Sequence, residues 1–329
     1  RLVGRAGRHL FRDEDIEFSI KGRGEDGRWS LHNGVIRHVT RPEEGRQATT
    51  LLEEMSVKWH PRAGQISEGA LTSSLQYADG ADKFSGHFSL GGNFKSNPAG
   101  LLAEADANAT FEIDSAEGFF ADARRLEAKV RMDLAPGHLR ELLVDFSRDE
   151  KAFGRVSVEG ERSRDGAGWK LDCGIFGVDR QVLNFIGARR GMDFQGTVLN
   201  ATNRVFYTPR DGRVKVSGRA MAGDFSLLRS AVTTPVVDAA VDFDLQLDLP
   251  GQQLELARLE LSGTQNEQKV LSGRLLEPLR LAWGAALAAE GGSRMELKLD
   301  GADLARWKTV LGNRVERGHV DATLNLTAR

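Results

Sequence analysis

One motif in the sequence has the spacing of a dinucleotide-binding loop: Gly22-Arg23-Gly24-Glu25-Asp26-Gly27, which follows a strand-like segment. A pyrophosphate site would also need a helix after the last glycine, whereas Arg28 to Leu31 continues as strand-like sequence. Glu25 and Asp26 would in addition repel the phosphate charges. We therefore interpret this motif as a hairpin turn.

Residues suited to metal binding or acid–base catalysis are scattered along the chain. A single cysteine, Cys173, leaves no partner for a disulfide or a cysteine-based zinc site. Acidic residues cluster at Asp13-Glu14-Asp15. Asp242, Asp244 and Asp248 alternate with apolar residues, as expected on the solvent-exposed face of a strand. We expect a protein without enzymatic activity, metal or cofactor. The histidines, which show no metal-ligand spacing, are His9, His32, His38, His60, His87, His138 and His319.

Composition narrows the class of protein. The 329 residues are 40% hydrophobic and 28% charged, which is typical of a globular chain. The 45 basic and 47 acidic residues are interspersed, so nucleic acid is not an expected partner. The longest apolar runs, such as 283–289, are shorter than the ~20 residues that span a bilayer. Because the chain begins at Arg1 and ends inside strand-like sequence, we expect it to be a portion of a longer protein.

The elements that would position any site follow a repeat. An alternating strand, a short amphipathic helix, a loop and a second alternating strand recur four times, and we place the helix anchors at Leu139, Val182, Phe225 and Leu304. In the last unit, Leu304, Trp307 and Leu311 would share one helical stripe. Expected N-caps are Asp179 and Asp303, and the small residues that open the second strands are Gly154, Gly196, Ala239 and Gly318.

Residues 1–120 lack helical patterns and are predicted to form a β-rich hairpin segment, with strands over 16–20, 29–39, 51–59, 70–77, 84–90 and 110–113. Residues 121–329 are predicted to hold the strand-helix-strand repeats, near 126–162, 169–205, 213–249 and 294–329. A β-hairpin insert at 250–284 pairs 254–261 with 269–276. The fold class is therefore mainly β with short helices: a long, curled, antiparallel-type sheet with short amphipathic helices between strands.

Such a sheet has more apolar surface than the chain can cover. Roughly 15 to 20 strands spaced ~4.8 Å apart would be ~70 to 95 Å wide, and open sheets rarely exceed ~10 strands without curling or splitting. Four helices, each ~10 Å across, would mask only ~40 Å of that width. We therefore expect an open apolar groove that binds lipid acyl chains, each methylene contributing ~0.8 kcal/mol.

The residues expected to line this groove are the apolar members of the alternating strands. They are Val130, Met132, Val156, Val158, Val214, Val216, Val241, Phe243, Leu245, Leu247, Leu254, Leu256, Met295, Leu297, Leu299, Val320, Leu324 and Leu326.

The arrangement resembles the AsmA-like and TamB-like group of bacterial envelope proteins. The resemblance covers about residues 120–329 and is carried by Leu297 to Trp307, Val310-Leu311-Gly312 and Gly318 to Leu326. It implies a repeating β-groove in the periplasm of a diderm bacterium, anchored to the inner membrane by a segment outside this chain. It also implies a role in phospholipid transport or outer-membrane maintenance, with phospholipid or another acyl lipid as the partner.

Two other classes stay open at this point. A structural or adhesive β-repeat protein would bury its apolar faces against each other and bind no lipid, so a hydrophobic dye would find no binding surface. A glycan-active enzyme would need paired carboxylates in an aromatic-lined cleft, and the sequence offers few aromatic residues for one.

Overall fold

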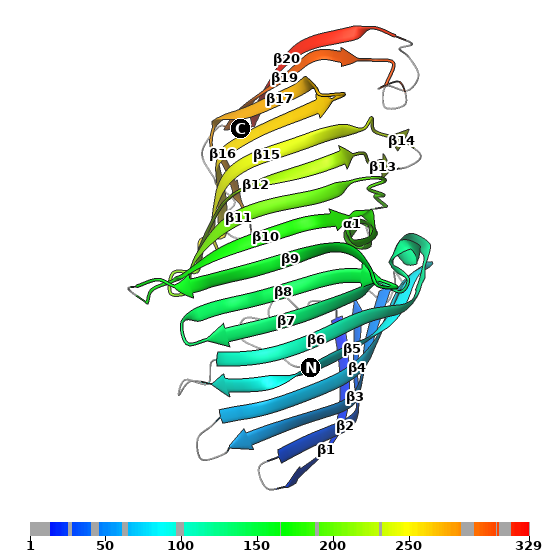
Figure 1. Ribbon diagram of the computed structural model, residues 1–329, viewed down its shortest axis with the longest axis vertical. Helices are drawn as coiled ribbons and strands as arrows, with labels where there is room; N and C mark the ends of the chain where they lie inside the picture. The colour runs from blue at the N-terminus through cyan, green and yellow to red at the C-terminus, as the bar shows by residue number, and fades with distance from the viewer. Residues whose placement is uncertain are drawn as a thin grey trace. The chain divides into compact units, whose positions relative to one another are not determined.

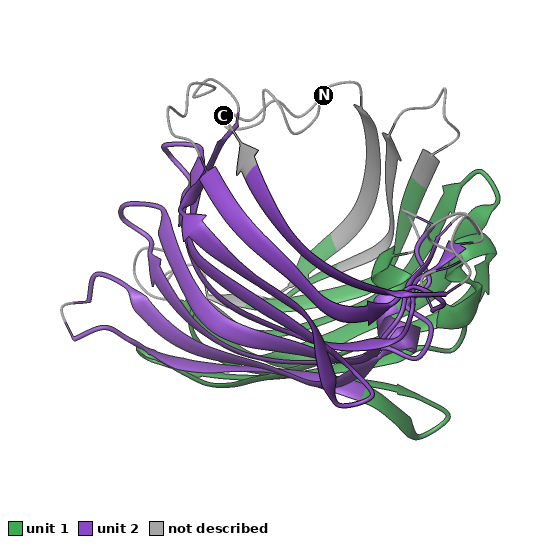
Figure 2. Ribbon diagram, turned by 90° about the horizontal axis from the view of Figure 1, so that it is seen from above, with its two compact units in different colours: residues 1–153, 184–188 green, residues 154–183, 189–329 purple. Residues whose placement is uncertain are grey.

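The computed structural model describes residues 14–25, 28–40, 46–60, 65–96, 102–164, 166–187, 191–229, 232–283, 293–306, 308 and 317–328. Strands account for 77% of the chain, and two short helices occur in the described part (Figure 1). This confirms the mainly-β, antiparallel fold class. Figure 2 colours the two compact units, which are residues 1–153 with 184–188 and residues 154–183 with 189–329; we refer to them as unit 1 and unit 2.

Unit 1 is an antiparallel meander in which each strand pairs with the next one in the chain. Two of its described reversals are tight turns: Gly80 and Gly137 adopt positive φ angles of 63° and 75° at the β4–β5 and β7–β8 reversals, where glycine avoids strain. The elements are β1 (Glu14–Glu25), β2 (Arg28–Thr40), β3 (Arg46–His60), β4 (Gln65–Asp79), β5 (Asp82–Ser96), β6 (Leu102–Glu117), the 3₁₀ helix η2 (Gly118–Ala123), β7 (Glu127–Ala135) and β8 (His138–Arg148).

Unit 2 is also an antiparallel meander, and a short two-stranded ribbon interrupts it. Most of β9 belongs to it, whereas the helix α1 contributes residues to both units. The elements are β9 (Lys151–Arg162), β10 (Trp169–Asp179), α1 (Arg180–Gly187), β11 (Val198–Thr208), β12 (Arg213–Phe225), β13 (Leu228–Arg229), β14 (Val232–Thr233), β15 (Val237–Asp248), β16 (Gln253–Gln265), β17 (Gln268–Glu277), β18 (Leu279–Ala282), β19 (Ser293–Asp303) and β20 (His319–Ala328).

The strands predicted within residues 1–120 all occur, and each is longer than its sequence pattern indicated. The Gly22–Gly27 motif belongs to the β1–β2 hairpin, whose pairing continues to Glu25 opposite Arg28; Asp26 and Gly27 lie outside the described residues. This confirms the turn interpretation. The predicted hairpin occurs between β16 and β17, but its pairing is shifted: residues 260–265 lie opposite 268–274, whereas Gln253 to Leu256 pair with β18. β16 also pairs with β15, and β17 with β19, so the hairpin is part of the sheet.

Only one of the four predicted repeat helices is confirmed. This helix is α1, which begins after Asp179 as expected, and the Asp179 Oδ1 atom accepts a hydrogen bond from the Gln181 N–H at 2.8 Å. The helix predicted at Leu139 is wrong, because residues 138–148 form β8. The tight turn at Gly137 sends the chain straight back along β7, where Ala135 pairs with His138.

The helix predicted at Phe225 is also wrong. Phe225 ends β12 and pairs with Val237 beyond a bulge that includes Asp224, whose φ is 49°. At the fourth site, Leu304 to Arg306 form a turn in which the Leu304 N–H donates to the Gly318 carbonyl. Trp307 and Leu311, the other members of that predicted stripe, lie outside the described residues.

The best-buried part of unit 1 lies where η2 returns to the sheet. Ile113 of β6 is 1% exposed, and its backbone N–H and carbonyl bond to Leu126 and Arg125 beyond the helix. Phe120 and Ala123 of η2 are buried there as well. Other buried apolar residues of unit 1, such as Leu52, Ala107 and Leu143, lie on the strands themselves.

Candidate functional site

The register of β12 and β15 sorts their side chains onto two faces. Val214 and Val216 lie opposite Leu247 and Leu245, and Gly218 lies opposite Phe243. Directly opposed residues of an antiparallel pair point to the same side of the sheet. The alternation predicted from the sequence therefore produces one apolar face on these two strands.

The same face continues across unit 2 in both directions. Toward β9, Val205 of β11 connects it to Leu171 of β10, and toward β20, Leu271 of β17 lies opposite Leu299 of β19. We call this surface the apolar face of unit 2. It brings together sixteen of the eighteen predicted groove residues: Val156, Val158, Val214, Val216, Val241, Phe243, Leu245, Leu247, Leu254, Leu256, Met295, Leu297, Leu299, Val320, Leu324 and Leu326.

No second layer of the described chain covers the central strands of this face. Every side chain of β12 and β15 keeps contact with solvent, and none is buried. In β20 the exposure is larger, with Leu324 at 49% and Leu326 at 50%. An apolar sheet face packed against another layer would bury such central residues, so the described structure leaves this face accessible.

The opposite face of unit 2 is hydrophilic and crossed by ion pairs between neighbouring strands. The Arg204 Nε atom lies 3.1 Å from Asp172, Arg274 lies 3.1 Å from Glu296, and Arg219 lies 3.8 Å from Asp242. These side chains are mostly solvent-exposed, so each pair contributes at most about 1 kcal/mol to stability. Their consequence is amphipathicity: charge on one side of the sheet and hydrocarbon on the other.

The two remaining predicted residues, Val130 and Met132, lie in unit 1. Their neighbours on both sides are apolar: Val144 and Leu142 on β8, and alanines on β6. The alanine Ala109 in turn lies opposite Leu90 of β5. Unit 1 therefore has an apolar face of its own, which includes both predicted residues.

An aromatic cluster covers one end of the unit 1 face. Phe84 lies on the same face of β5 as Leu90, and its ring contacts Tyr77, Phe120 and Phe185 at centroid distances of 5.3, 5.1 and 5.5 Å. Phe120 comes from η2 and Phe185 from α1. The sequence predicts the helix anchored at Val182, to which Phe185 belongs, but no local pattern indicates which strands Phe185 contacts.

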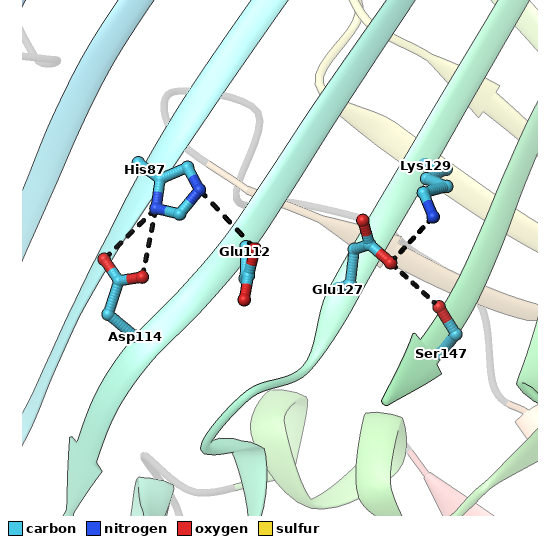
Figure 3. Close-up of polar contacts among 6 residues, drawn as sticks. All are labelled: His87, Glu112, Asp114, Glu127, Lys129 and Ser147. Carbon is cyan, nitrogen blue, oxygen red and sulfur yellow. Dashed lines mark hydrogen bonds and ion pairs between the residues drawn. The ribbon is translucent and has the colours of Figure 1, made fainter. Parts of the chain in front are cut away.

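The hydrophilic face of unit 1 carries the closest approach to an acid–base group in the described residues. His87 of β5 lies between two carboxylates of β6, with Nδ1 at 3.0 Å from Asp114 and Nε2 at 3.5 Å from Glu112 (Figure 3). Nearby, Glu127 accepts from Ser147 and pairs with Lys129. His87 is half exposed, and no group of three or more potential ligands in the described part could hold a metal ion.

Two shallow hollows lie on the hydrophilic face of unit 2, with volumes of ≈ 360 and ≈ 480 Å³. Charged and hydroxyl side chains dominate both, including Glu159 and Arg204 in the first and Lys269 and Glu296 in the second. Two cross-strand ion pairs neutralise part of this charge, Arg204 with Asp172 in the first hollow and Arg274 with Glu296 in the second. Within β16, Arg258 donates a hydrogen bond to Glu260, which raises the pKa of the Arg258 guanidinium.

One polar group interrupts the apolar face of unit 2. Asn203 of β11 lies between Cys173 of β10 and Gly218 of β12, and its side chain rests over Gly218, where a Cβ atom would collide with it. The Asn203 Oδ1 atom is buried and accepts no hydrogen bond. Burial first, and the charge of Asp172 second, raise the pKa of the Cys173 thiol. Neither the buried Asn203 Oδ1 atom without a hydrogen bond nor the raised pKa of Cys173 was predicted from the sequence.

Within the described residues, no helix is long and apolar enough to cross a bilayer. No family model, curated protein or solved structure matches this chain.

Proposed function

We propose that the apolar face of unit 2 binds the acyl chains of lipids and that the protein transfers them without catalysing a reaction. The observation that carries this proposal is the accessible row of apolar side chains across β12 and β15, none of which is buried. An apolar surface of this extent on a soluble protein is typical of a binding site.

The physical driving force is the transfer of hydrocarbon out of water. Each methylene that moves onto the face contributes ~0.8 kcal/mol, so an acyl chain of ordinary length can bind without a specific polar contact. Such binding fits a face whose few polar groups are isolated, as Asn203 is. It also permits sliding from strand to strand, because neighbouring sites along the sheet are chemically alike.

Through its resemblance to AsmA-like and TamB-like proteins, we extend the proposal to the cell. The protein would act in the periplasm of a diderm bacterium, attached to the inner membrane by a segment outside this chain, and would support phospholipid transport or outer-membrane maintenance.

Mass spectrometry of lipids extracted from the purified protein tests the proposal. Phe243→Glu and Leu245→Glu place a charge on the apolar face and should remove most of the bound lipid. Gln246→Glu introduces the same charge on the same strand but on the hydrophilic face, where Lys215 lies opposite, and should leave the lipid content unchanged. Equal lipid content in all three folded variants would overturn the assignment of the face.

The rival function is a structural β-repeat protein whose apolar faces are buried against each other. Because side chains of β12 and β15 all contact solvent, that function needs a further layer supplied by another molecule. Binding of a hydrophobic dye to delipidated protein distinguishes the two, since a face covered in this way would leave the dye no surface.

A further inference from the structure

Across β10, β11, β12 and β15, which the structure describes in full, Asn203 is the one amide side chain on the apolar face of unit 2 (Figure 1). Its cross-strand neighbours are Cys173 and Gly218, and the next residues of this face along β11 are Ala201 and Val205. Asn203 therefore places a hydrogen-bonding group in surroundings that otherwise suit hydrocarbon.

The Asn203 amide has no hydrogen-bond partner in the described part of the chain. Its Oδ1 atom rests over Gly218 and is buried without a hydrogen bond. The residue as a whole is half-buried and its Nδ2 atom is not buried, so the two N–H groups of the amide stay accessible. A valine here would suit a strand and leave no amide unpaired, so packing alone does not account for asparagine.

A lipid that lies on this face would remove the Nδ2 donors from water. Hydrocarbon offers no acceptor, so covering the amide with an acyl chain alone would cost free energy. A phosphate offers acceptors but carries charge, and no cationic side chain of β10, β11, β12 or β15 lies on this face to balance it. The ester carbonyl of a lipid is neutral, accepts a hydrogen bond and is joined directly to the acyl chain, so it would satisfy the amide.

We propose that Asn203 donates a hydrogen bond to the ester carbonyl of a bound acyl lipid and thereby makes the apolar face of unit 2 select ester-linked lipids. This inference rests on the proposed function and adds the chemical class of the ligand and the residue that recognises it. Burial of hydrocarbon supplies the affinity anywhere along the face, whereas the carbonyl is held at one position. A lipid with ether linkages has no carbonyl and would leave the amide unpaired.

A competition between two lipids that differ in this carbonyl tests the inference. Delipidated protein is equilibrated with vesicles that contain equal amounts of ester-linked dioleoyl phosphatidylcholine and its ether-linked analogue, dioleyl phosphatidylcholine, and mass spectrometry quantifies both lipids on the recovered protein. Wild-type protein should carry about five times more of the ester lipid, which corresponds to one hydrogen bond.

Two substitutions on β11 make the test specific to Asn203. Asn203→Leu removes the amide and should bind the two lipids in equal amounts. Thr202→Val removes a hydroxyl group from the opposite face of the same strand, where Thr202 is exposed, and should retain the preference for the ester lipid.

The competition separates failure of this inference from failure of the proposed function. Equal amounts of the two lipids on wild-type protein, as expected if water serves the amide, would overturn the inference and leave lipid binding intact. The same ester preference in Asn203→Leu would do so as well. Absence of both lipids from wild-type protein would instead overturn the proposed function, and this inference with it.

Infrared spectroscopy of bound dioleoyl phosphatidylcholine, isotope-labelled at its ester carbonyls, gives a measurement without a competing lipid. A hydrogen bond from Nδ2 lowers the stretching frequency of a carbonyl group. Part of the labelled band should therefore lie at lower frequency on wild-type protein than on folded Asn203→Leu. Identical bands on the two proteins would overturn the inference.

Discussion

Phe185 of α1 packs against Phe84 of β5 with ring centroids 5.5 Å apart, although the two residues are distant in sequence. The same helix residue also contacts Phe120 of η2 at 5.6 Å. Residues 184–188 accordingly group with unit 1, even though the strands before and after α1 belong to unit 2. The aromatic cluster and a hydrogen bond from Asn184 to Asp122 at 3.1 Å connect this part of the helix to unit 1.

Removing the Phe185 ring should destabilise unit 1. Because the ring is half-buried and contacts two other aromatic rings, we expect Phe185→Ala to lower the free energy of unfolding by ~1–3 kcal/mol, measured by urea denaturation. Ile186, the next residue, is 71% exposed, so Ile186→Ala should change it by less than ~0.5 kcal/mol. Equal effects of the two substitutions would show that the cluster contributes little.

A side chain at Gly154 should be poorly tolerated. Gly154 has a φ of 122°, and a Cβ atom there would lie 2.5 Å from the Val178 Cα atom on β10. We expect Gly154→Ala to lower the thermal unfolding midpoint clearly, with a cost of ~1–3 kcal/mol. Gly91→Ala is the matched control, because a Cβ at Gly91 meets no atom within 4 Å. Similar midpoints for both variants would contradict the close approach of β9 and β10.

The strands of this fold could be predicted because the alternation of apolar and polar residues along a strand is visible in the sequence alone. β15 shows this most clearly, with Val241, Phe243, Leu245 and Leu247 on one face and the polar residues Asp242, Asp244 and Gln246 between them. The same reasoning failed at β8, where Leu139, Leu142, Leu143 and Phe146 fit a helical stripe. Leu142 and Phe146 also fit a strand, and the turn at Gly137 decided between the two.

For the candidate site, the sequence predicted which residues share a face but not which distant segments contact each other. Alternation indicates which residues of a strand share a face, and the observed registers place sixteen predicted residues on the apolar face of unit 2. Contacts between distant segments could not be predicted. The packing of Phe185 on Phe84 and the position of Asn203 over Gly218 both depend on register and on chain reversals, which a single sequence does not specify.

Replacing Asn203 should stabilise unit 2. Its Oδ1 atom is buried without a hydrogen bond, a state that costs about 1–3 kcal/mol, and valine favours strands. We expect Asn203→Val to raise the free energy of unfolding by ~1 kcal/mol in urea denaturation.

Asn200, on the same strand, provides the contrast. Its Oδ1 atom accepts a hydrogen bond from the Gly177 N–H at 2.8 Å, so Asn200→Val should instead lower the free energy of unfolding by ~1 kcal/mol. A loss of stability in both variants would mean that Asn203 has a partner in solution, such as a bound water molecule or ligand.

The reactivity of Cys173 should report both its environment and the occupancy of the apolar face. Because burial and Asp172 raise the pKa of this thiol, less thiolate is present at any given pH than in a free cysteine, and alkylation should be slower. The rate should rise only at higher pH, and Asp172→Asn, which removes the second cause, should shift that rise toward lower pH.

Cys173 lies opposite Val158 and Asn203, so a lipid on this face would cover it. We therefore expect alkylation of lipid-loaded protein, followed by mass spectrometry at a fixed pH, to be slower than that of delipidated protein. Phe243→Glu, which should bind little lipid, ought to react at the delipidated rate before and after exposure to lipid. Identical rates for loaded and delipidated wild-type protein would place the lipid somewhere other than over β10 and β11.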